Sequence, residues 1–241
     1  MRRYDGRQPE EMRPVTITKD FIKYPEGSVL IECGDTKVIC NATVEEGVPP
    51  FKKGSGSGWV TAEYSMLPRA TNPRGRRDVS KLKLSPRSAE IQRLVGRALR
   101  SVTDMDALGE RTITIDCDVI QADGGTRCAS ITGGFVALVL ALDKLRQEGI
   151  FKKLPLRGYV AAVSCGMVND NPLLDLCYVE DSGAQVDCNF IMDDKGNIIE
   201  LQGTGEERPF SKKEMDAMYA LAEKGIGELI AAQKEAIGDL L

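Results

Sequence analysis

The chain has 241 residues, of which 42% are hydrophobic and 28% are charged, and its formal net charge is −4. This is enough apolar material for a sizeable core, in one domain or in two fused halves of about residues 1–150 and 151–241. The sequence contains no histidine. That excludes Ser-His and Cys-His catalytic pairs and histidine-bound metals, so any chemistry must use carboxylates, arginines, lysines, hydroxyls, backbone amides or an oxygen-bound metal.

The sequence also shapes the expected location of the protein. Residues 1–7 have no apolar run behind them, unlike a secretory signal, and the longest apolar stretch, 135–142, is too short to cross a bilayer. The seven cysteines include no Cys-x-x-Cys pair, which is typical of buried thiols in a reducing compartment. We therefore expect a soluble cytoplasmic protein without a membrane partner.

The first third of the chain predicts β-strands. Two β-rich runs, 27–33 and 36–44, flank a turn at 33–35 and predict a hairpin. A further strand is expected at 59–66, after a break rich in proline and glycine. The segment 69–83 is rich in Pro, Gly and Arg and has no periodicity, which predicts a long exposed loop.

Two helices and a strand are expected next. A serine and a proline at 85–86 supply an N-cap and an N1 residue, and apolar residues follow at helical spacing up to residue 102. Alternating polar and apolar residues at 112–119 predict a strand. A glycine pair at 124–125 then leads into a helix with one apolar face that ends near residue 149.

The second half repeats this alternation loosely. A capping box formed by Ser211 and Glu214 predicts the start of a long C-terminal helix. Strands are expected at 157–167, 173–179, 184–192 and 198–202. The order of elements predicts an α+β fold with mixed sheets.

The segment 121–127 has the features of an anion site. Its two glycines let the backbone approach a ligand closely, and the helix that follows offers free N–H groups and the positive end of its dipole. Thr126 adds a hydroxyl, and Arg127 adds a planar set of donors suited to phosphate oxygens. Arg87, in the first turn of the earlier helix, could aim at the same anion. The alternative is a glycine turn beside one solvated arginine.

Paired carboxylates form a second candidate site. Asp181 is expected to close one strand and Asp187 to lie within the next, so pairing through a turn at 182–183 would bring the two together. Without histidine, such a pair suits Mg²⁺ or Mn²⁺. The alternative is an ordinary turn with one exposed strand carboxylate, and Asp116 and Asp118 are rival carboxylates.

Basic residues are concentrated between residues 69 and 100. This stretch has ten arginines and lysines against two acidic residues, although the whole chain is mildly acidic. Arg93, Arg97 and Arg100 fall on the polar side of the expected helix. Such an uneven distribution predicts a polyanion site, the alternative being a solvated basic face.

Several segments, in order along the chain, resemble the RNase PH family of phosphate-dependent exoribonucleases. They are 32–38, 58–69, 90–94, 121–127 with 129–133, and 178–182. Together they span almost the whole chain. The resemblance implies a single RNase PH domain over residues 1–241 with the ribosomal protein S5 domain 2-like fold.

The resemblance also implies roles for particular residues. The expected ligands of inorganic phosphate are Arg87, Gly125, Thr126 and Arg127. Asp181 and Asp187 would bind Mg²⁺ (or Mn²⁺) or act directly on the scissile phosphodiester, with Arg127 as a further catalytic group. The expected RNA contacts are Arg69, Arg74, Arg77, Arg93 and Arg97.

Family members remove nucleotides beyond the 3′-terminal CCA of transfer RNA, release nucleoside diphosphates reversibly, and form hexameric rings that are trimers of dimers. We therefore expect a cytoplasmic enzyme that trims transfer RNA precursors. Two departures from the family pattern are Ser85-Pro86 before Arg87, where Gly-Gly is common, and an additional arginine at position 76. A non-catalytic ring subunit of an exosome-like assembly and a metal-dependent hydrolase stay open as alternatives.

Overall fold

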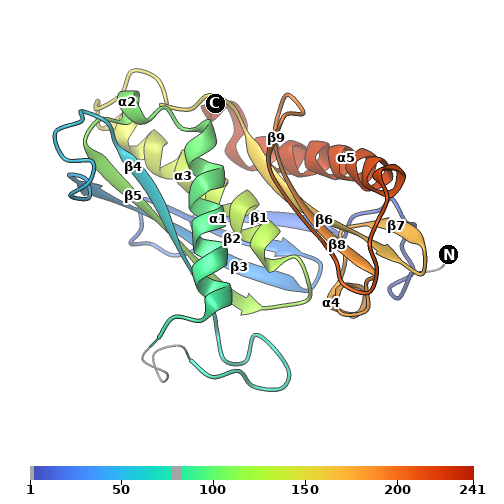
Figure 1. The fold of residues 1–241 in the computed structure, drawn as a ribbon. Helices are drawn as coiled ribbons and strands as arrows, with labels where there is room; N and C mark the ends of the chain where they lie inside the picture. Colours follow the sequence, from blue (N-terminus) through green and yellow to red (C-terminus); the bar gives the residue numbers. More distant parts are fainter. Residues whose placement is uncertain (1–2, 78–82) are drawn as a thin grey trace.

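The computed structural model describes residues 3–77 and 83–241. Among these residues, the first half of the chain forms a five-stranded sheet in the order β1-β2-β3-β5-β4, with β4 parallel to β5 and the other neighbours antiparallel (Figure 1). The elements of this half are β1 (Val15–Lys19), β2 (Gly27–Cys33), β3 (Thr36–Glu46), β4 (Trp59–Met66), α1 (Pro86–Val102), α2 (Met105–Leu108), β5 (Arg111–Gln121) and α3 (Thr126–Gln147).

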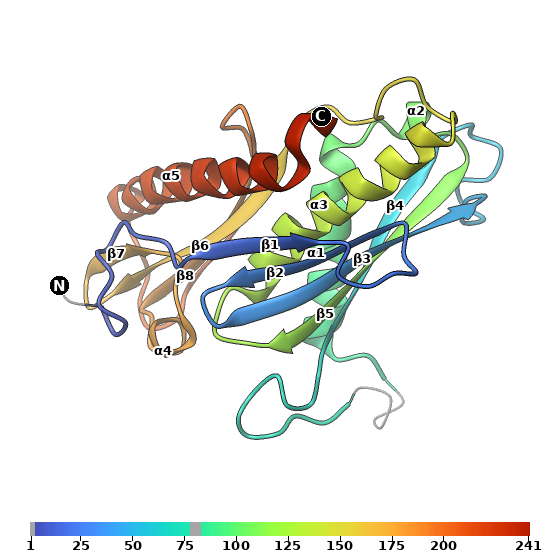
Figure 2. The ribbon, with the colours of Figure 1, turned by 180° about the vertical axis from the view of Figure 1, so that it is seen from behind.

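Residues 151–241, all of which are described, form an antiparallel four-stranded sheet in the order β7-β6-β8-β9. The elements of this half are β6 (Val160–Val168), β7 (Asn171–Leu174), α4 (Tyr178–Asp181), β8 (Val186–Asp193), β9 (Ile198–Gly205), α5 (Lys212–Ile237) and the short 3-10 helix η2 (Gly238–Leu240). Helix α5 packs on β6 and β7, and β1 of the first sheet lies beside it (Figure 2).

Helix α3 joins the two halves into one core. It contacts β2 and β3 of the first sheet, β6 of the second sheet, and α5. We expected one apolar face, but α3 is buried nearly all round because elements of both sheets cover it. Its length and hydropathy would suit a membrane-spanning helix, yet 89% of its apolar window is buried inside the molecule, which identifies a core helix.

Local sequence signals determine where the helices begin. Ser85 caps α1 by accepting a hydrogen bond from the amide of Ser88, and Pro86 is the first helical residue, as expected. The capping box of Ser211 and Glu214 at the start of α5 is also present. The seven cysteines are all buried and free, which confirms that they form no disulfide framework.

Two expectations about strands were wrong or incomplete. We missed β1, a short strand at the edge of the first sheet with little buried surface. The expected strand at 173–179 is also wrong, because β7 ends at Leu174 and the chain turns at Asp175, whose φ is +53°. Residues 178–181 then form the short helix α4. Asp181 therefore lies at the end of a short helix and does not meet Asp187 through a strand hairpin.

Candidate active site

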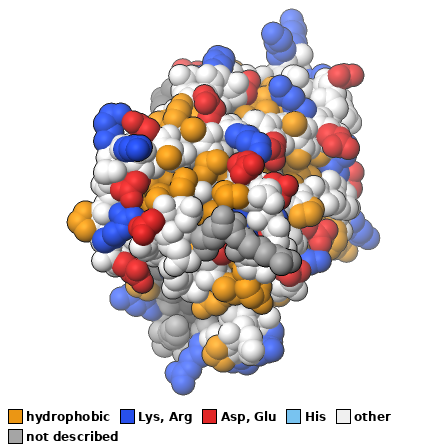
Figure 3. All heavy atoms as spheres, turned by 90° about the vertical axis from the view of Figure 1, so that its right-hand side faces the viewer, with side chains coloured by type: hydrophobic (Ala, Val, Ile, Leu, Met, Phe, Trp, Pro, Cys, Tyr) orange, Lys and Arg blue, Asp and Glu red, His pale blue; other side chains and the backbone are white. Residues whose placement is uncertain are grey.

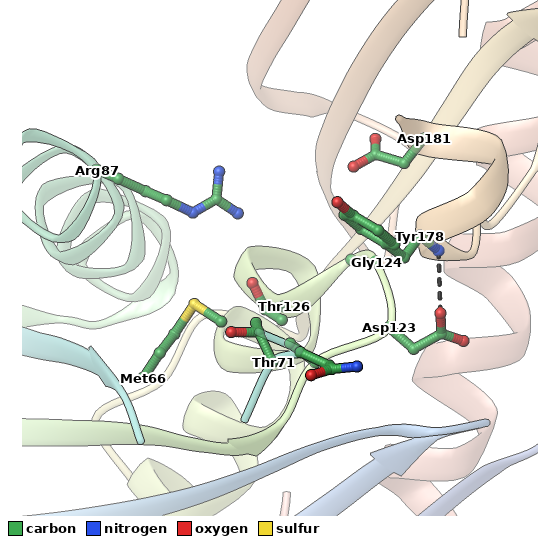
Figure 4. A pocket seen from close by; sticks show the side chains of 11 residues that line it. Met66, Thr71, Arg87, Asp123, Gly124, Thr126, Tyr178 and Asp181 are labelled. Carbon is green, nitrogen blue, oxygen red and sulfur yellow. Dashed lines mark hydrogen bonds between the residues drawn. The ribbon is translucent and has the colours of Figure 1, made fainter. Parts of the chain in front are cut away.

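A pocket of about 530 Å³ lies where the two halves of the chain meet. Its wall is formed by the end of β4 with part of the following loop, the start of α1, the turn between β5 and α3, and α4. Figure 4 shows Arg87 reaching into the pocket from α1, with Asp181 and Tyr178 on the opposite side and Thr126 between them. The fold therefore brings together residues that are far apart in the sequence.

The start of α3 presents backbone amides to this pocket. Gly125 is the N-cap, with a φ of +66° and no side-chain cap, so the first amides of a 22-residue helix are available to an anion. The hydroxyl of Thr126 lies 2.8 Å from the hydroxyl of Tyr64. Burial raises the pKa of Tyr64, against a smaller opposite effect of this hydrogen bond. The phenol thus stays neutral and can serve as a hydrogen-bond donor.

The turn before α3 lies directly against the segment that leads into α4. Gly124 has a φ of +75°, and a Cβ atom added there would lie 2.5 Å from the carbonyl oxygen of Leu176. One residue earlier, the carboxylate of Asp123 accepts a hydrogen bond of 3.1 Å from the amide of Tyr178 (Figure 4). Only glycine at position 124 permits this approach of two backbones.

The two arginines that were expected to bind phosphate are held differently. Arg87 is exposed and points into the pocket (Figure 4). Arg127 is partly buried, and its guanidinium donates hydrogen bonds to Gln202, at 2.8 Å, and to Glu90, at 3.5 Å. Burial raises the pKa of Asp181, and the positive charges of Arg87 and Arg127 oppose that rise. Both guanidinium groups therefore lie within electrostatic reach of the acidic side of the pocket.

Asp181 and Asp187 do come together, but not through a strand hairpin. Asp181 ends α4, while Asp187 lies on β8, and β7 and β8 each pair with β6 rather than with each other. Burial raises the pKa of Asp187 to about 6, and the negative charge of Asp181 adds to the rise. The two carboxylates thus interact, and one of them carries a proton for much of the time near pH 6.

This carboxylate pair fits a divalent metal ion. The Oδ1 atom of Asp187 is buried and accepts no hydrogen bond from the described residues, which is costly unless a proton or a cation compensates it. Two carboxylates suit Mg²⁺ or Mn²⁺, which take their remaining ligands from water and substrate phosphates. Residues 3–77 and 83–241 contain no group of three or more His, Cys, Asp or Glu side chains able to enclose a metal. An ion bound by Asp181 and Asp187 would therefore take its remaining ligands from water and substrate.

The basic loop lies beside the pocket. Residues 69–77 form no helix or strand, as expected for this part of the loop, and residues 78–82 lie outside the described residues. Arg76 lines a second, adjoining cavity of about 290 Å³ together with Arg87. Basic side chains gather at the lower end of the molecule in Figure 3, at the height of this loop in Figure 1. The remaining loop arginines, all exposed, are Arg69, Arg74 and Arg77.

Arg93 and Arg97 lie away from the pocket. Because a helix rises 1.5 Å per residue, Arg97 lies about 15 Å along α1 from Arg87. The guanidinium of Arg97 makes two hydrogen bonds, of 2.9 and 2.7 Å, to the carboxylate of Glu200. Arg93 and Arg97 instead line a separate hollow of about 280 Å³ beside Trp59. The structure thus groups them with each other and not with the phosphate site.

The rival carboxylates Asp116 and Asp118 also lie away from the pocket. Residues such as Ile115 on β5 are buried in the core, and the two aspartates alternate with them on the other face of the sheet. Burial raises the pKa of both aspartates, and the charge of Glu63 on β4 adds to the rise. They belong to the sheet surface and do not line the pocket.

Sequence reasoning missed several side chains around the pocket. Tyr64 and Tyr178 line the two adjoining cavities. They lie within 58–69 and 178–182, which had been noted for their resemblance to the family. The N-terminal arginines Arg3 and Arg13 are buried against the segment that precedes α4 and against α4 itself. Residues 1–7 had been considered only as evidence against a signal peptide, and Arg13 had not been considered. Four arginines within residues 1–13, against three acidic residues, were the available sequence signal.

Sequence models of two domains match the chain. The model described as "3′ exoribonuclease family, domain 1" matches residues 11–142, and the one described as "domain 2" matches residues 158–225. Ribonuclease PH of Bacillus velezensis is 60% identical over 240 residues, covering 99% of this chain and 98% of the relative. Ribonuclease PH of Bacillus subtilis has the same identity and coverage.

Solved structures share the fold at lower identity. Rice Rrp46 has a TM-score of 0.79 at 18% identity and covers 99% of this chain and 100% of that one. An Archaeoglobus fulgidus exosome with RNA bound to the active site has a TM-score of 0.82 at 22% identity and covers 95% of this chain and 91% of that one. The chain has the RNase PH fold and belongs to the RNase PH family of 3′ exoribonucleases.

Proposed function

We propose that this protein is a phosphate-dependent 3′→5′ exoribonuclease that trims transfer RNA precursors and other RNA 3′ ends in the cytoplasm. The observation that carries the proposal is a single pocket in which a helix N-terminus and Arg87 face Asp181. Phosphorolysis of RNA needs an anion site for the attacking phosphate beside groups that meet the scissile phosphodiester. The name Ribonuclease PH, borne by relatives 60% identical over nearly the whole chain, supports the same reaction.

The reaction exchanges one phosphorus–oxygen bond for another. An oxygen of inorganic phosphate bonds to the phosphorus of the last phosphodiester, and the bond from that phosphorus to the preceding 3′ oxygen breaks. The products are a nucleoside diphosphate and an RNA shortened by one nucleotide, and the reverse reaction adds a nucleotide. Phosphate is already anionic, so a strong base is unnecessary, which suits a chain without histidine.

Each group in the pocket has a proposed role. The amides of Gly125 and Thr126 and the guanidinium of Arg87 bind and orient phosphate. Arg127, held by its neighbours on α1 and β9, also binds phosphate and offsets negative charge next to the acidic pair. The leaving 3′ oxygen takes up a proton, and the attacking hydrogen phosphate gives one up as it becomes part of the diphosphate, so the proton balance needs no acid from the chain.

Asp181 and Asp187 would also hold the divalent metal, Mg²⁺ or Mn²⁺, which when bound neutralises charge on the transferring phosphoryl group. The arginines of the 69–77 loop support binding of the RNA backbone, because basic side chains contact phosphates without regard to sequence. Assembly into a hexameric ring, a trimer of dimers, is part of the proposal. The fold shared with an archaeal exosome core supports it.

A non-catalytic ring subunit would have no need for a phosphate arginine or an acidic pair. The presence of Arg127, Asp181 and Asp187 therefore argues for an enzyme. A hydrolase would need clustered carboxylates and no anion site, whereas this pocket opens onto a helix N-terminus.

Degradation of a short 3′-labelled RNA with Mg²⁺, with and without inorganic phosphate, tests the reaction. We expect nucleoside diphosphates only when phosphate is present, and loss of activity in Arg127→Ala. Arg157→Ala, which removes an exposed arginine that does not line the pocket and pairs with Asp104 at 3.8 Å, is the matched control. Nucleoside monophosphates formed without phosphate would favour a hydrolase, and no degradation would favour a non-catalytic subunit.

A further inference from the structure

Arginines near the start of the chain lie against the segment that carries Asp181. Arg3 is 3% exposed, and its guanidinium donates to both carboxylate oxygens of Glu180, at 2.8 and 2.6 Å. The same group donates to the carbonyl oxygen of Leu174 at 2.8 Å. Arg7 donates to the carboxylate of Asp175 at 3.2 Å. These contacts fix the end of β7 and the start of α4.

Arg13 is different because it reaches both sides of the pocket. It is 6% exposed, and its Nε and Nη2 atoms donate to the carboxylate of Asp175 at 2.9 and 2.6 Å. Its Nη1 atom donates to the backbone carbonyl of Asp123, in the turn before α3, and lies 3.7 Å from the carboxylate of the same residue. One guanidinium thus binds the phosphate turn and the segment before α4 simultaneously.

The surroundings show that this bridge is tightly built. A Cβ atom added to Gly125 would lie 3.2 Å from Nη2 of Arg13, so the N-cap of α3 rests directly on the guanidinium. Burial alone would raise the pKa of Asp175, but the hydrogen bonds and charge of Arg13 hold it below the ordinary value. A planar guanidinium with five donors can satisfy both partners, whereas a lysine ammonium is a single point of charge.

We propose that Arg13 is a positioning residue that sets the spacing between the phosphate site at the start of α3 and the acidic pair of Asp181 and Asp187. The inference rests on the proposed function of this pocket. Arg13 acts through the Asp123 turn and through Asp175, and it does not line the pocket itself.

The variant Arg13→Lys tests the proposal, with Arg7→Lys as its matched control, because Arg7 also binds Asp175 but makes no contact with the turn at 121–125 among the described residues. For Arg13→Lys we expect the KM for phosphate to rise about tenfold and kcat to fall at least about tenfold, since a displacement of 1 Å can cost 10²-fold in rate. For Arg7→Lys the KM for phosphate should stay within about twofold of wild type.

Hydrogen exchange followed by mass spectrometry gives a second measurement that needs no activity. Arg13→Lys should speed exchange in peptides covering both 121–128 and 174–182, whereas Arg7→Lys should affect only 174–182. Wild-type protein that degrades no RNA with phosphate would refute the proposed function, yet the exchange experiment would still test the bridge.

An unchanged phosphate KM together with unchanged exchange at 121–128 in Arg13→Lys would overturn the inference. Should Arg13→Lys fail to fold, Asp175→Asn weakens the same bridge from its other end and should produce the same pattern. Faster exchange confined to 174–182 in that variant would equally overturn it.

Discussion

Replacing Gly124 by alanine would test whether the phosphate turn packs directly on the segment before α4. An alanine at the observed φ of +75° is strained by about 1–2 kcal/mol. Its Cβ atom would lie 2.5 Å from the carbonyl oxygen of Leu176 and 3.0 Å from the amide nitrogen of Tyr178. These are backbone atoms that cannot rotate aside, so overpacking adds about 1–3 kcal/mol. We expect a loss of about 2–5 kcal/mol in the free energy of unfolding and about 100-fold in activity, because the turn must shift.

Thermal unfolding measures this loss of stability, because 1 kcal/mol shifts the midpoint by about 2–4 °C for a chain of this size. Two glycine variants serve as controls. Gly227→Ala adds a methyl group to α5 with nothing within 4 Å, so it should be neutral or stabilising by up to about 1 kcal/mol. Gly125→Ala has a similar φ of +66°, but its Cβ atom would lie 3.2 Å from Nη2 of Arg13, a contact relieved by a shift of a few tenths of an ångström, so it should lose only about 1–2 kcal/mol. Equal losses for Gly124→Ala and Gly125→Ala would refute the argument from backbone contact.

Three further predictions concern the charged groups. Folded protein keeps a proton on Asp187 up to about pH 6 while the unfolded chain loses it near 3.8, so this residue lowers stability as pH rises from about 4 to 6. Asp187→Asn should abolish activity. In metal-free buffer at pH 7 it should raise the free energy of unfolding by up to about 3 kcal/mol. Thermal unfolding at several pH values should show that this gain shrinks toward pH 4. Gln202→Ala removes a hydrogen-bond partner of Arg127 and should raise the KM for phosphate about 3- to 10-fold in initial-rate measurements. Arg74→Ala should weaken RNA binding and reduce its salt dependence in fluorescence anisotropy, whereas Arg97→Ala, whose side chain is already ion-paired, should change neither.

Local structure was largely predictable from the sequence. The helices α1 and α5 begin where their caps predicted, and β4 and the β2–β3 hairpin lie within about two residues of the expected ranges. The glycine turn ahead of α3 was predicted for the same reason, because a glycine pair before an apolar helix is a local signal. The loop at 69–77 was also predicted from composition, because it is rich in Pro, Gly and Arg and has no periodicity.

Contacts between distant segments were harder to predict. The expected hairpin of Asp181 and Asp187 was wrong, because β7 ends at Leu174, the chain turns at Asp175 with a positive φ, and Asp181 ends the short helix α4. Arg97 was expected to contact RNA, and its ion pair with Glu200, 103 residues away, could not be predicted from the sequence. Nothing near Arg13 in the sequence indicates that it pairs with a residue 162 positions later.

Short-range features of the sequence were enough to predict most helices and strands, the absence of imidazole chemistry, the glycine turn ahead of α3 and the family, although the segment of α4 was expected to be part of a strand. The packing of distant segments, in contrast, brings particular candidate charges together, lets Arg13 bridge Asp123 and Asp175, and buries Asp187 so that its pKa rises to about 6. The difference follows from the distance over which each interaction acts. Caps, turns and periodicity act over a few residues, whereas pairing and burial of charges depend on how distant segments pack.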